Sequence, residues 1–143
     1  MGKVLPFVKV AIKHQGRFIV CRSVISSESV WDLPGAQVYF GETPLDALSR
    51  GSANMLDTVL KKAASIDLFW CLQHNNQEQV LCNLFECDLS STNFASKFGA
   101  EEYLSHDFDT FTQYKFVTLD EFLLSKARIQ SESMDQALKK IKL

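Results

Sequence analysis

The chain has 143 residues, which fits a single domain (residues 1–143) with a sizeable hydrophobic core. Hydrophobic residues make up 46% and charged residues 22%, as in ordinary globular domains, and the net charge of -2 argues against a general nucleic-acid binder. Because no apolar run approaches the ~20 residues that span a bilayer, and no signal peptide is evident, we expect a cytoplasmic protein without a membrane partner.

The chain begins with two predicted strands. Residues 4–13 and 17–23 are rich in β-branched and aromatic residues, and the HQGR sequence at 14–17 between them is a turn signal, so we predict a β-hairpin. A serine-rich connection, 23–30, follows. Arg22 beside it is a candidate substrate contact, and the competing interpretation is a solvated arginine at a strand end.

The stretch 31–57 carries the most specific signal of the chain. Gly35 and Gly41 bracket a loop, and Thr43 is a good N-cap for a helix that the following proline can begin. Asp46 stands at the spacing of a capping-box acid. A loop that leads into a helix N-terminus is a common place for phosphate groups.

This stretch resembles the Nudix box, G-x(5)-E-x(7)-R-E-U-x-E-E-x-G-U with U aliphatic, which is usually preceded by W-x-L-P-G. The residues at the matching positions are Trp31, Leu33, Pro34 and Gly35 in the lead-in, Ala36 at the opening glycine, Glu42 at the first glutamate and Arg50 at the arginine. The resemblance covers roughly residues 4–125 and implies an α/β fold, the Nudix α/β/α sandwich around a mixed β-sheet.

The resemblance ends after Arg50. Gly51 stands where the family has the glutamate that follows the arginine, and Asn54 and Met55 stand where it has the glutamate pair. In Nudix hydrolases these glutamates hold Mg²⁺ or Mn²⁺ against a pyrophosphate, and the spacing i, i+3, i+4 places them on one helix face. An amide and a thioether are poor substitutes for carboxylates around Mg²⁺. We therefore expect no metal at this box and no cofactor.

The retained box residues are candidates for substrate binding: Gly35, Gly41 and Arg50, with Arg22 from outside the box. Each has a structural alternative, since the glycines can shape the loop and Arg50 can pair with Asp46 at i−4 on a solvated helix face. Glu42 is a candidate catalytic residue.

After the box helix, the sequence predicts a helix end and a second hairpin. Lys61 and Lys62 suit the C-terminus of a helical segment that ends near Ala64. Residues 66–72 and 80–89 read as strands separated by a polar turn, with three aromatic residues expected to be buried in a sheet face: Phe69, Trp70 and Phe85. The four cysteines lie in strand-like runs without the spacing of a zinc site, so buried thiols are expected.

Residues 90–112 are predicted to form a long acidic loop. It carries Glu101, Glu102, Asp107 and Asp109, and in many Nudix enzymes a loop at this place supplies a general base or a metal ligand. An acidic surface loop is the competing interpretation. Beyond it, 114–122 resembles the closing strand and helix of the family, with the capping-box pair Thr118 and Glu121, and a last helix is predicted from about Ser133.

The leading hypothesis is a Nudix-like domain whose hydrolase centre has decayed, a pseudoenzyme that retains nucleotide binding or acts as a protein-interaction module. The ligand would be a nucleotide or sugar nucleotide, and a homodimer or a protein partner is compatible with the family. The alternative is an active hydrolase of nucleotides or sugar nucleotides that recruits Mg²⁺ or Mn²⁺ through Glu42 and the carboxylates of the 99–112 segment. The sequence names no substrate.

Overall fold

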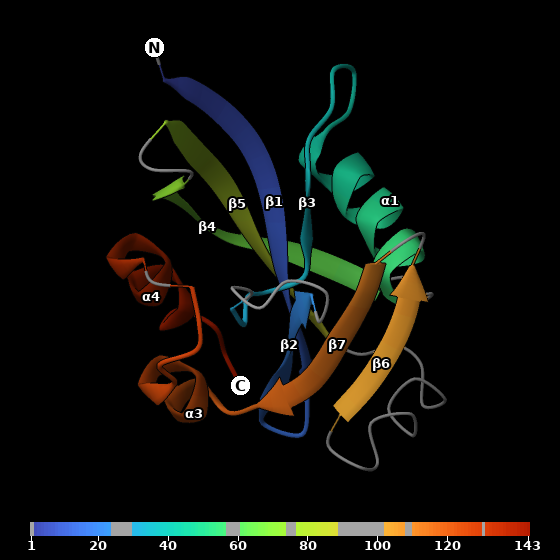
Figure 1. Cartoon of the computed structure of the whole chain (residues 1–143), viewed down its shortest axis with the longest axis vertical. Coiled ribbons are helices and arrows are strands. Elements are labelled where there is room, and N and C mark those ends of the chain that lie inside the picture. The colour runs from blue at the N-terminus through green and yellow to red at the C-terminus, as the bar shows by residue number, and fades with distance from the viewer. Residues whose placement is uncertain are drawn as a thin grey trace.

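The computed structural model describes residues 2–23, 30–56, 61–73, 77–88, 102–107, 110–129 and 131–143. Within them a mixed sheet and three helices are defined (Figure 1). The strands are β1 (Lys3–His14), β2 (Arg17–Ser23), β3 (Gly35–Gln37), β4 (Lys61–Gln73), β5 (Glu78–Asp88), β6 (Glu102–Asp107) and β7 (Thr110–Val117). The helices are α1 (Pro44–Leu56), α3 (Leu119–Leu124) and α4 (Glu132–Leu138).

The sheet has the order β4-β5-β1-β2-β7-β6, and the short β3 pairs with β1 outside this path. The long strands β1 and β5 run parallel, whereas the other pairs are antiparallel, so the sheet is mixed as predicted. The first hairpin is confirmed. Its turn uses Gln15 and Gly16 at positive φ, a conformation that glycine adopts without steric penalty.

Helices lie on both sides of the sheet (Figure 1). On one side, α3 and α4 pack through Phe122, Met134 and Leu138 onto Phe18, Leu84 and other apolar side chains of the sheet. On the other side, α1 packs through Ala47 and Leu48 onto alternate residues of β1 and β5. Because successive strand residues point to opposite faces, β1 contributes to both cores, and the predicted α/β/α sandwich is confirmed.

The prediction that a helix continues to Ala64 is wrong. Lys61 and Lys62 begin β4, and this strand pairs along its length with β5, with register shifts between Lys61 and Ala64 and between Ser65 and Asp67. Pairing with a neighbouring strand outweighs the weak local helix preference of the KKAA sequence. The buried positions are confirmed for Phe69 and Phe85, but Trp70 is 49% exposed because it points to the face over which the described residues form no helix at this place.

The long loop expected at 90–112 is also wrong in its second half. Residues 102–107 and 110–117 form the antiparallel pair β6 and β7, which begins before the predicted strand at 114. The acidic residues that suggested a loop stand at the ends of β6, where Glu102 begins the strand and Asp107 ends it. This acidic segment is a strand because it pairs along its whole length with β7.

The C-terminal predictions are confirmed. Thr118 and Glu121 form the capping box of α3, and α4 begins at Glu132 behind the N-cap Ser131 with the expected apolar residues buried. All four cysteines are buried and reduced, and burial raises the pKa of the Cys82 and Cys87 thiols to about 12. No helix in the described part of the chain is both long and apolar enough to cross a membrane.

Candidate functional site

The candidate site is the loop between β3 and α1, which β1 holds at its base. The amide of Val10 donates to the carbonyl of Pro34 and the amide of Val38 donates to the carbonyl of Pro6, both at 2.9 Å. At Gly35 the two strands approach so closely that an added Cβ would collide with the carbonyl oxygen of Val8. A glycine is therefore required here for packing alone.

The loop then turns into α1 through a complete capping box. The Thr43 amide donates to Asp46 Oδ2 at 3.0 Å, and the Asp46 amide donates to Thr43 Oγ1 at 3.1 Å. Gly41, just before, has φ +87°, which a side chain would strain. This confirms the predicted helix start. The cap also places the carboxylate of Asp46 at the N-terminus of α1. A negative charge therefore already lies at this end of the helix.

Arg50, one and a half turns into α1, reaches back and holds the loop together. Its Nε donates to Glu42 Oε2 at 2.8 Å, and its Nη2 donates to Glu42 Oε1 at 3.0 Å and to the carbonyl of Gln37 at 2.6 Å. Its guanidinium carbon lies 4.1 Å from the ring centroid of Tyr39. The alternative that Arg50 pairs with Asp46 at i−4 is wrong, because Asp46 is used by the cap and Glu42 offers a two-point acceptor.

The carboxylate of Glu42 is hydrogen-bonded to Arg50 and also within the loop itself. Its Oε1 also accepts from the Tyr39 amide at 2.9 Å. The hydrogen bonds from Arg50, and next the one from the Tyr39 amide, hold the pKa of the Glu42 carboxyl below its ordinary value. The same pair raises the pKa of Arg50, chiefly through the hydrogen bond to Glu42. Glu42 is thus an ionised acceptor that organises the loop, and a catalytic role for it stays a prediction.

The family's metal ligands belong on the second half of α1. Residues 51, 54 and 55 all lie within the helix, so the i, i+3, i+4 relation that the sequence predicted is present in the backbone. The residues there are Gly51, Asn54 and Met55, which together supply no carboxylate. This donor set does not fit Mg²⁺ or Mn²⁺, which prefer charged oxygen ligands. No group of three or more histidine, cysteine or acidic residues with metal-site geometry exists among the described residues.

Two cations meet at a tryptophan on the α3/α4 side of the sheet. Arg22 donates from Nε to Gln113 Oε1 at 2.9 Å, and its guanidinium carbon lies 4.5 Å from the Trp31 ring centroid. Lys115 Nζ lies 4.2 Å from the same centroid. Trp31 is 5% exposed, and cation–π contacts to a buried ring hold both cations in place. Arg22, which the sequence predicted as a substrate contact, therefore lies beside Lys115, and nothing in the sequence indicated that these two cations share one ring.

The acidic candidates of the 99–112 segment divide into two groups. Glu101 and Asp109 lie outside the described residues. Glu102 and Asp107 stand at the two ends of β6, and this strand makes contacts with α1 (Figure 1). The backbone therefore places β6 next to the helix that bears positions 51, 54 and 55.

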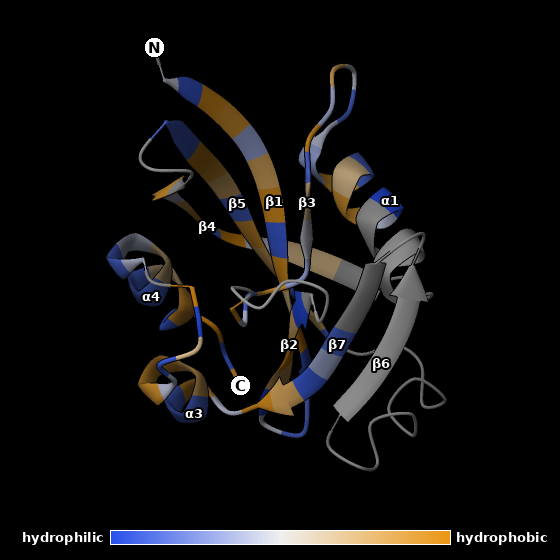
Figure 2. Ribbon diagram, in the orientation of Figure 1, coloured by the Kyte–Doolittle hydropathy of each residue, from blue (hydrophilic) through white to orange (hydrophobic). Residues whose placement is uncertain are grey.

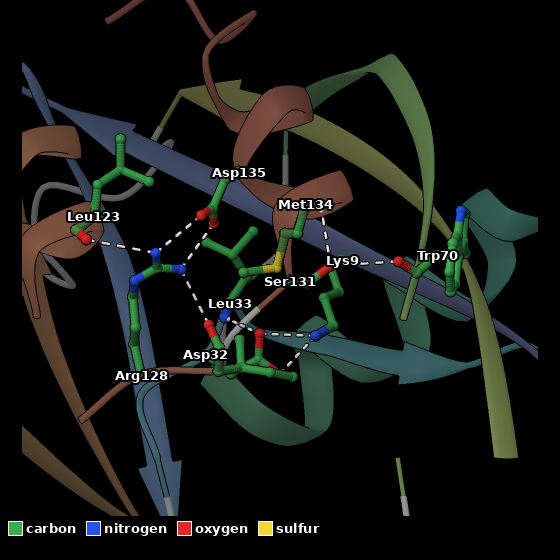
Figure 3. Close-up of polar contacts among 10 residues, drawn as sticks. Lys9, Asp32, Leu33, Trp70, Leu123, Arg128, Ser131, Met134 and Asp135 are labelled. Carbon is green, nitrogen blue, oxygen red and sulfur yellow. Dashed lines mark hydrogen bonds and ion pairs between the residues drawn. The ribbon is translucent and has the colours of Figure 1, made fainter. Parts of the chain in front are cut away.

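A buried ion pair was missed in the sequence. Lys9 in β1 donates from Nζ to both carboxylate oxygens of Asp32, at 2.7 and 2.6 Å, and Asp32 Oδ1 accepts from the Leu33 amide (Figure 3). The Lys9 side chain is 8% exposed. Burial alone lowers the pKa of Lys9, but the attraction of Asp32 outweighs it and leaves that pKa raised. A lysine inside the apolar run FVKVAI, on the face that α4 covers, was the signal that could have revealed the pair.

A second ion pair lies beside it. Arg128, 6% exposed, donates to both carboxylate oxygens of Asp135 at 2.7 and 2.9 Å and also to backbone carbonyls at Leu123 and Ile129 (Figure 3). It joins the end of α3 to α4. The adjacent chain also holds Trp31, whose backbone exchanges hydrogen bonds with Ala127 and Ile129. The Lys9–Asp32 pair thus joins the lead-in to β1, and the backbone hydrogen bonds of Trp31 join it to the C-terminal layer that Arg128 and Asp135 connect.

No protein-family model matches the sequence, and no curated protein matches it significantly. Solved structures do match the fold. A MutT Nudix hydrolase from Burkholderia pseudomallei has a TM-score of 0.69 at 16% identity and covers 97% of this chain and 98% of its own. The MutT protein from Methanosarcina mazei Go1 has a TM-score of 0.72 at 15% identity, covering 96% and 92%. A Nudix hydrolase from Nitrosomonas europaea has a TM-score of 0.70 at 12% identity, covering 95% and 86%. The loop geometry and these likenesses together show that the chain has the Nudix (MutT) hydrolase fold.

Proposed function

We propose that this Nudix-fold domain binds a nucleotide or sugar nucleotide without hydrolysing it. The proposal rests on a contrast between the first half of α1, with the loop before it, and the second half of the same helix. The loop and the first half of α1 keep a fully bonded geometry around Arg50 and Glu42, whereas positions 51, 54 and 55 of the same helix offer no carboxylate. Loss of the metal ligands on a retained scaffold favours binding over turnover.

Binding of an anionic ligand is supported by the two cations at Trp31. Arg22 and Lys115 both lie within about 5 Å of one ring, and partly buried cations of this kind interact with phosphate oxygens more strongly than solvated ones. Within the described residues Arg22 gives its Nε to Gln113, and a guanidinium has five donors in all. The helix N-terminus, where Asp46 closes the cap, is the less suitable place for a phosphate.

The chemistry assigned to these residues is recognition. Arg22 and Lys115 would hold the phosphates, and Trp31 would fix the two cations. No residue set among those described would generate a metal-bound hydroxide, so no hydrolytic step is assigned.

Isothermal titration calorimetry with a panel of nucleotides and sugar nucleotides, in excess chelator, tests the proposal. A ligand at ~100 times its Kd should also add ~2.7 kcal/mol to the free energy of unfolding. The variant that carries Arg22→Gln and Lys115→Gln should lose the heat of binding, whereas Lys139→Gln, an exposed lysine after α4, should retain it. Absence of binding at millimolar concentration would favour an interaction module instead.

One observation favours a second candidate, an active hydrolase with relocated ligands. The contact between β6 and α1 brings this strand, which begins at Glu102 and ends at Asp107, beside the helix that bears positions 51, 54 and 55. Hydrolysis that requires Mg²⁺ or Mn²⁺, and that falls in the Glu102→Gln or Asp107→Asn variant, would support this candidate and reject the proposal above.

A further inference from the structure

The sheet is covered unequally on its two faces. The face toward α4 is buried at Phe69, Cys71, Val80 and Cys82. On the opposite face, α1 covers only the half of β1 and β5 that contains Val8, Val10 and Phe85. The other half, formed by the first residues of β1 and their neighbours in β5 and β4, has no helix over it in the described part of the chain.

The strand register identifies the side chains on this open half, which we call the open face. Leu81 of β5 pairs with Pro6 of β1 and with Trp70 of β4, and positions two residues away share the same side. Leu68 is 73% exposed, Trp70 49% and Leu81 50%. The large exposed apolar residues of the open face are Val4, Leu68, Trp70, Leu72 and Leu81. In Figure 2 the strands β1, β4 and β5 carry bands of hydrophobic colour interrupted by hydrophilic ones.

A groove of about 360 Å³ runs along one edge of the open face. It lies between the sheet and the start of α1, and its walls include Trp70, Leu81, Val38 and Pro44. The last two residues are the ends of the β3–α1 loop, which rises beside the groove (Figure 1). Phe40 in this loop is fully exposed, and Tyr39 beside it is about half exposed. A groove and a projecting aromatic side chain therefore adjoin each other.

We propose that the open face and the β3–α1 loop form a homodimer interface, in which Phe40 of each copy enters the groove of the other. In a two-fold dimer the same patch faces itself, so a patch that contains both a projection and a recess can complement its own copy. A single exposed phenylalanine is ordinary on a protein surface, but a continuous apolar face with such a projection is typical of an interface.

The charge distribution of the groove favours a second copy of this chain as its binding partner. A two-fold axis places every charge of a patch near its own copy, so a charged patch repels itself. The residues that line the groove carry no carboxylate, ammonium or guanidinium: Pro6, Phe7, Val38, Pro44, Leu68, Phe69, Trp70, Leu81, Cys82 and Asn83. The lining of the groove offers nothing to attract a charged partner and no charge that would repel its own copy.

The size of the surface also fits. Seven apolar side chains of the open face and the loop are about half or more exposed: Val4, Tyr39, Phe40, Leu68, Trp70, Leu72 and Leu81. At roughly 150–250 Å² for each whole aromatic side chain, and less for each aliphatic one, their exposed parts offer several hundred Å² of apolar surface. About 800 Å² per partner is the area of a standard stable interface. The cations at Trp31 lie on the other face of the sheet, so this dimer leaves them accessible.

Sedimentation velocity and light scattering over a concentration series test the proposal on the full chain. Wild type should be a dimer at about 50 µM, an affinity within reach of an interface of this area. Phe40→Ser and Leu81→Glu should each raise the dimer dissociation constant by at least about tenfold. Leu124→Ser is the matched control, because Leu124 is 82% exposed on α3, away from the open face, and it should leave the dimer unchanged.

Phe40→Ser keeps the test valid even if Leu81→Glu disturbs folding, because Phe40 is fully exposed and its loss removes no internal packing. As a second readout, Trp70 fluorescence should shift to shorter wavelengths when the dimer forms. A wild-type monomer at about 50 µM would overturn the proposal, whether or not the face binds another protein. So would a dimer that survives both Phe40→Ser and Leu81→Glu, or one that Leu124→Ser weakens equally.

Discussion

Arg50 donates two hydrogen bonds to the carboxylate of Glu42, eight residues earlier in the chain, and a third to the carbonyl of Gln37. One guanidinium thereby joins the end of β3, the loop and α1. The two residues are the ones that the sequence aligned with the first glutamate and the arginine of the Nudix box. Their pairing accounts for the presence of both residues in a chain that lacks the metal ligands, because the loop itself depends on them.

This pairing predicts that guanidinium geometry, and not charge alone, holds the loop. Arg50→Lys keeps the charge but cannot donate to Gln37 and both Glu42 oxygens at once. Amide exchange at Tyr39, whose N–H donates to Glu42, should accelerate roughly two- to tenfold in Arg50→Lys, the factor of one ordinary net hydrogen bond. Arg50→Ala should accelerate it further. Unchanged exchange in both variants, measured by NMR, would show that the loop is held by other contacts.

The sequence predicted the fold where local signals and tertiary contacts agree. The glycines, the two capping boxes and the alternating strands all act over a few residues, so β1, β2, the start of α1 and α3 were predicted correctly. It failed where pairing with a distant strand decides the structure. Lys61 and Lys62 lie in a strand because β5 is available as a partner, and the acidic segment before residue 110 pairs with β7 for the same reason.

The site was predictable only in part, for a similar reason. The positions of Glu42 and Arg50 followed from motif spacing, but their mutual bond did not, since Asp46 at i−4 was an equally good partner until the cap engaged it. Contacts between residues far apart in the sequence, such as Lys9 with Asp32 or Lys115 with Trp31, carry no local signal.

The buried pair Lys9–Asp32 predicts unequal effects of removing its two members. Asp32→Ala leaves an ammonium in a site that is 8% exposed and should cost about 3–5 kcal/mol of unfolding free energy. Lys9→Met should cost less, because the Asp32 side chain is 28% exposed and can be hydrated. The double variant Lys9→Met/Asp32→Asn should be more stable than Asp32→Ala. Urea unfolding measures all three.

The same pair gives a test by pH. With Asp32 removed, burial would lower the folded pKa of Lys9 below its unfolded value, so the unfolded state would bind more protons and stability would rise with pH up to about 10. Wild type should show no such rise, because its folded Lys9 pKa is raised and the group stays charged. An Asp32→Ala variant as stable as wild type at neutral pH would mean that the pair is not buried in solution.

Acid should weaken the fold through three carboxyls with lowered pKa. Hydrogen bonds from Arg50 lower that of Glu42, those from Thr118 lower that of Glu121, and that from Lys140 lowers that of Asp67. Each folded pKa lies below the unfolded one, so the contribution is complete above the ordinary values of 4.5 and 3.8 and is lost as the pH falls through the folded values. Urea midpoints should be level from pH 7 to about 5 and then fall. Glu121→Gln should reduce the fall, and midpoints that stay level down to pH 3 would contradict this assignment.

Rebuilding the box should restore a metal site if the scaffold is intact. The variant with Gly51→Glu, Asn54→Glu and Met55→Glu places three carboxylates on adjacent turns of α1 and should gain several degrees of melting temperature on addition of Mn²⁺ or Mg²⁺. Gly51→Ala is the control for helix propensity, since replacing a glycine inside a helix is worth about 0.5–1 kcal/mol by itself. Wild type and the control should not respond to metal. A folded triple variant that ignores both metals would show that the helix is no longer placed to hold them.

The central claim, that this Nudix-fold domain does not hydrolyse nucleotides, is tested most directly by a turnover assay of the wild-type chain. Release of phosphate and of nucleoside monophosphate would be followed with nucleoside triphosphates, ADP-ribose, sugar nucleotides and dinucleoside polyphosphates, in Mg²⁺ or Mn²⁺ and in chelator. We expect no metal-dependent release from any of them, because α1 lacks carboxylates at positions 51, 54 and 55. A kcat near the ~10 s⁻¹ typical of enzymes, abolished by chelator, would contradict the claim.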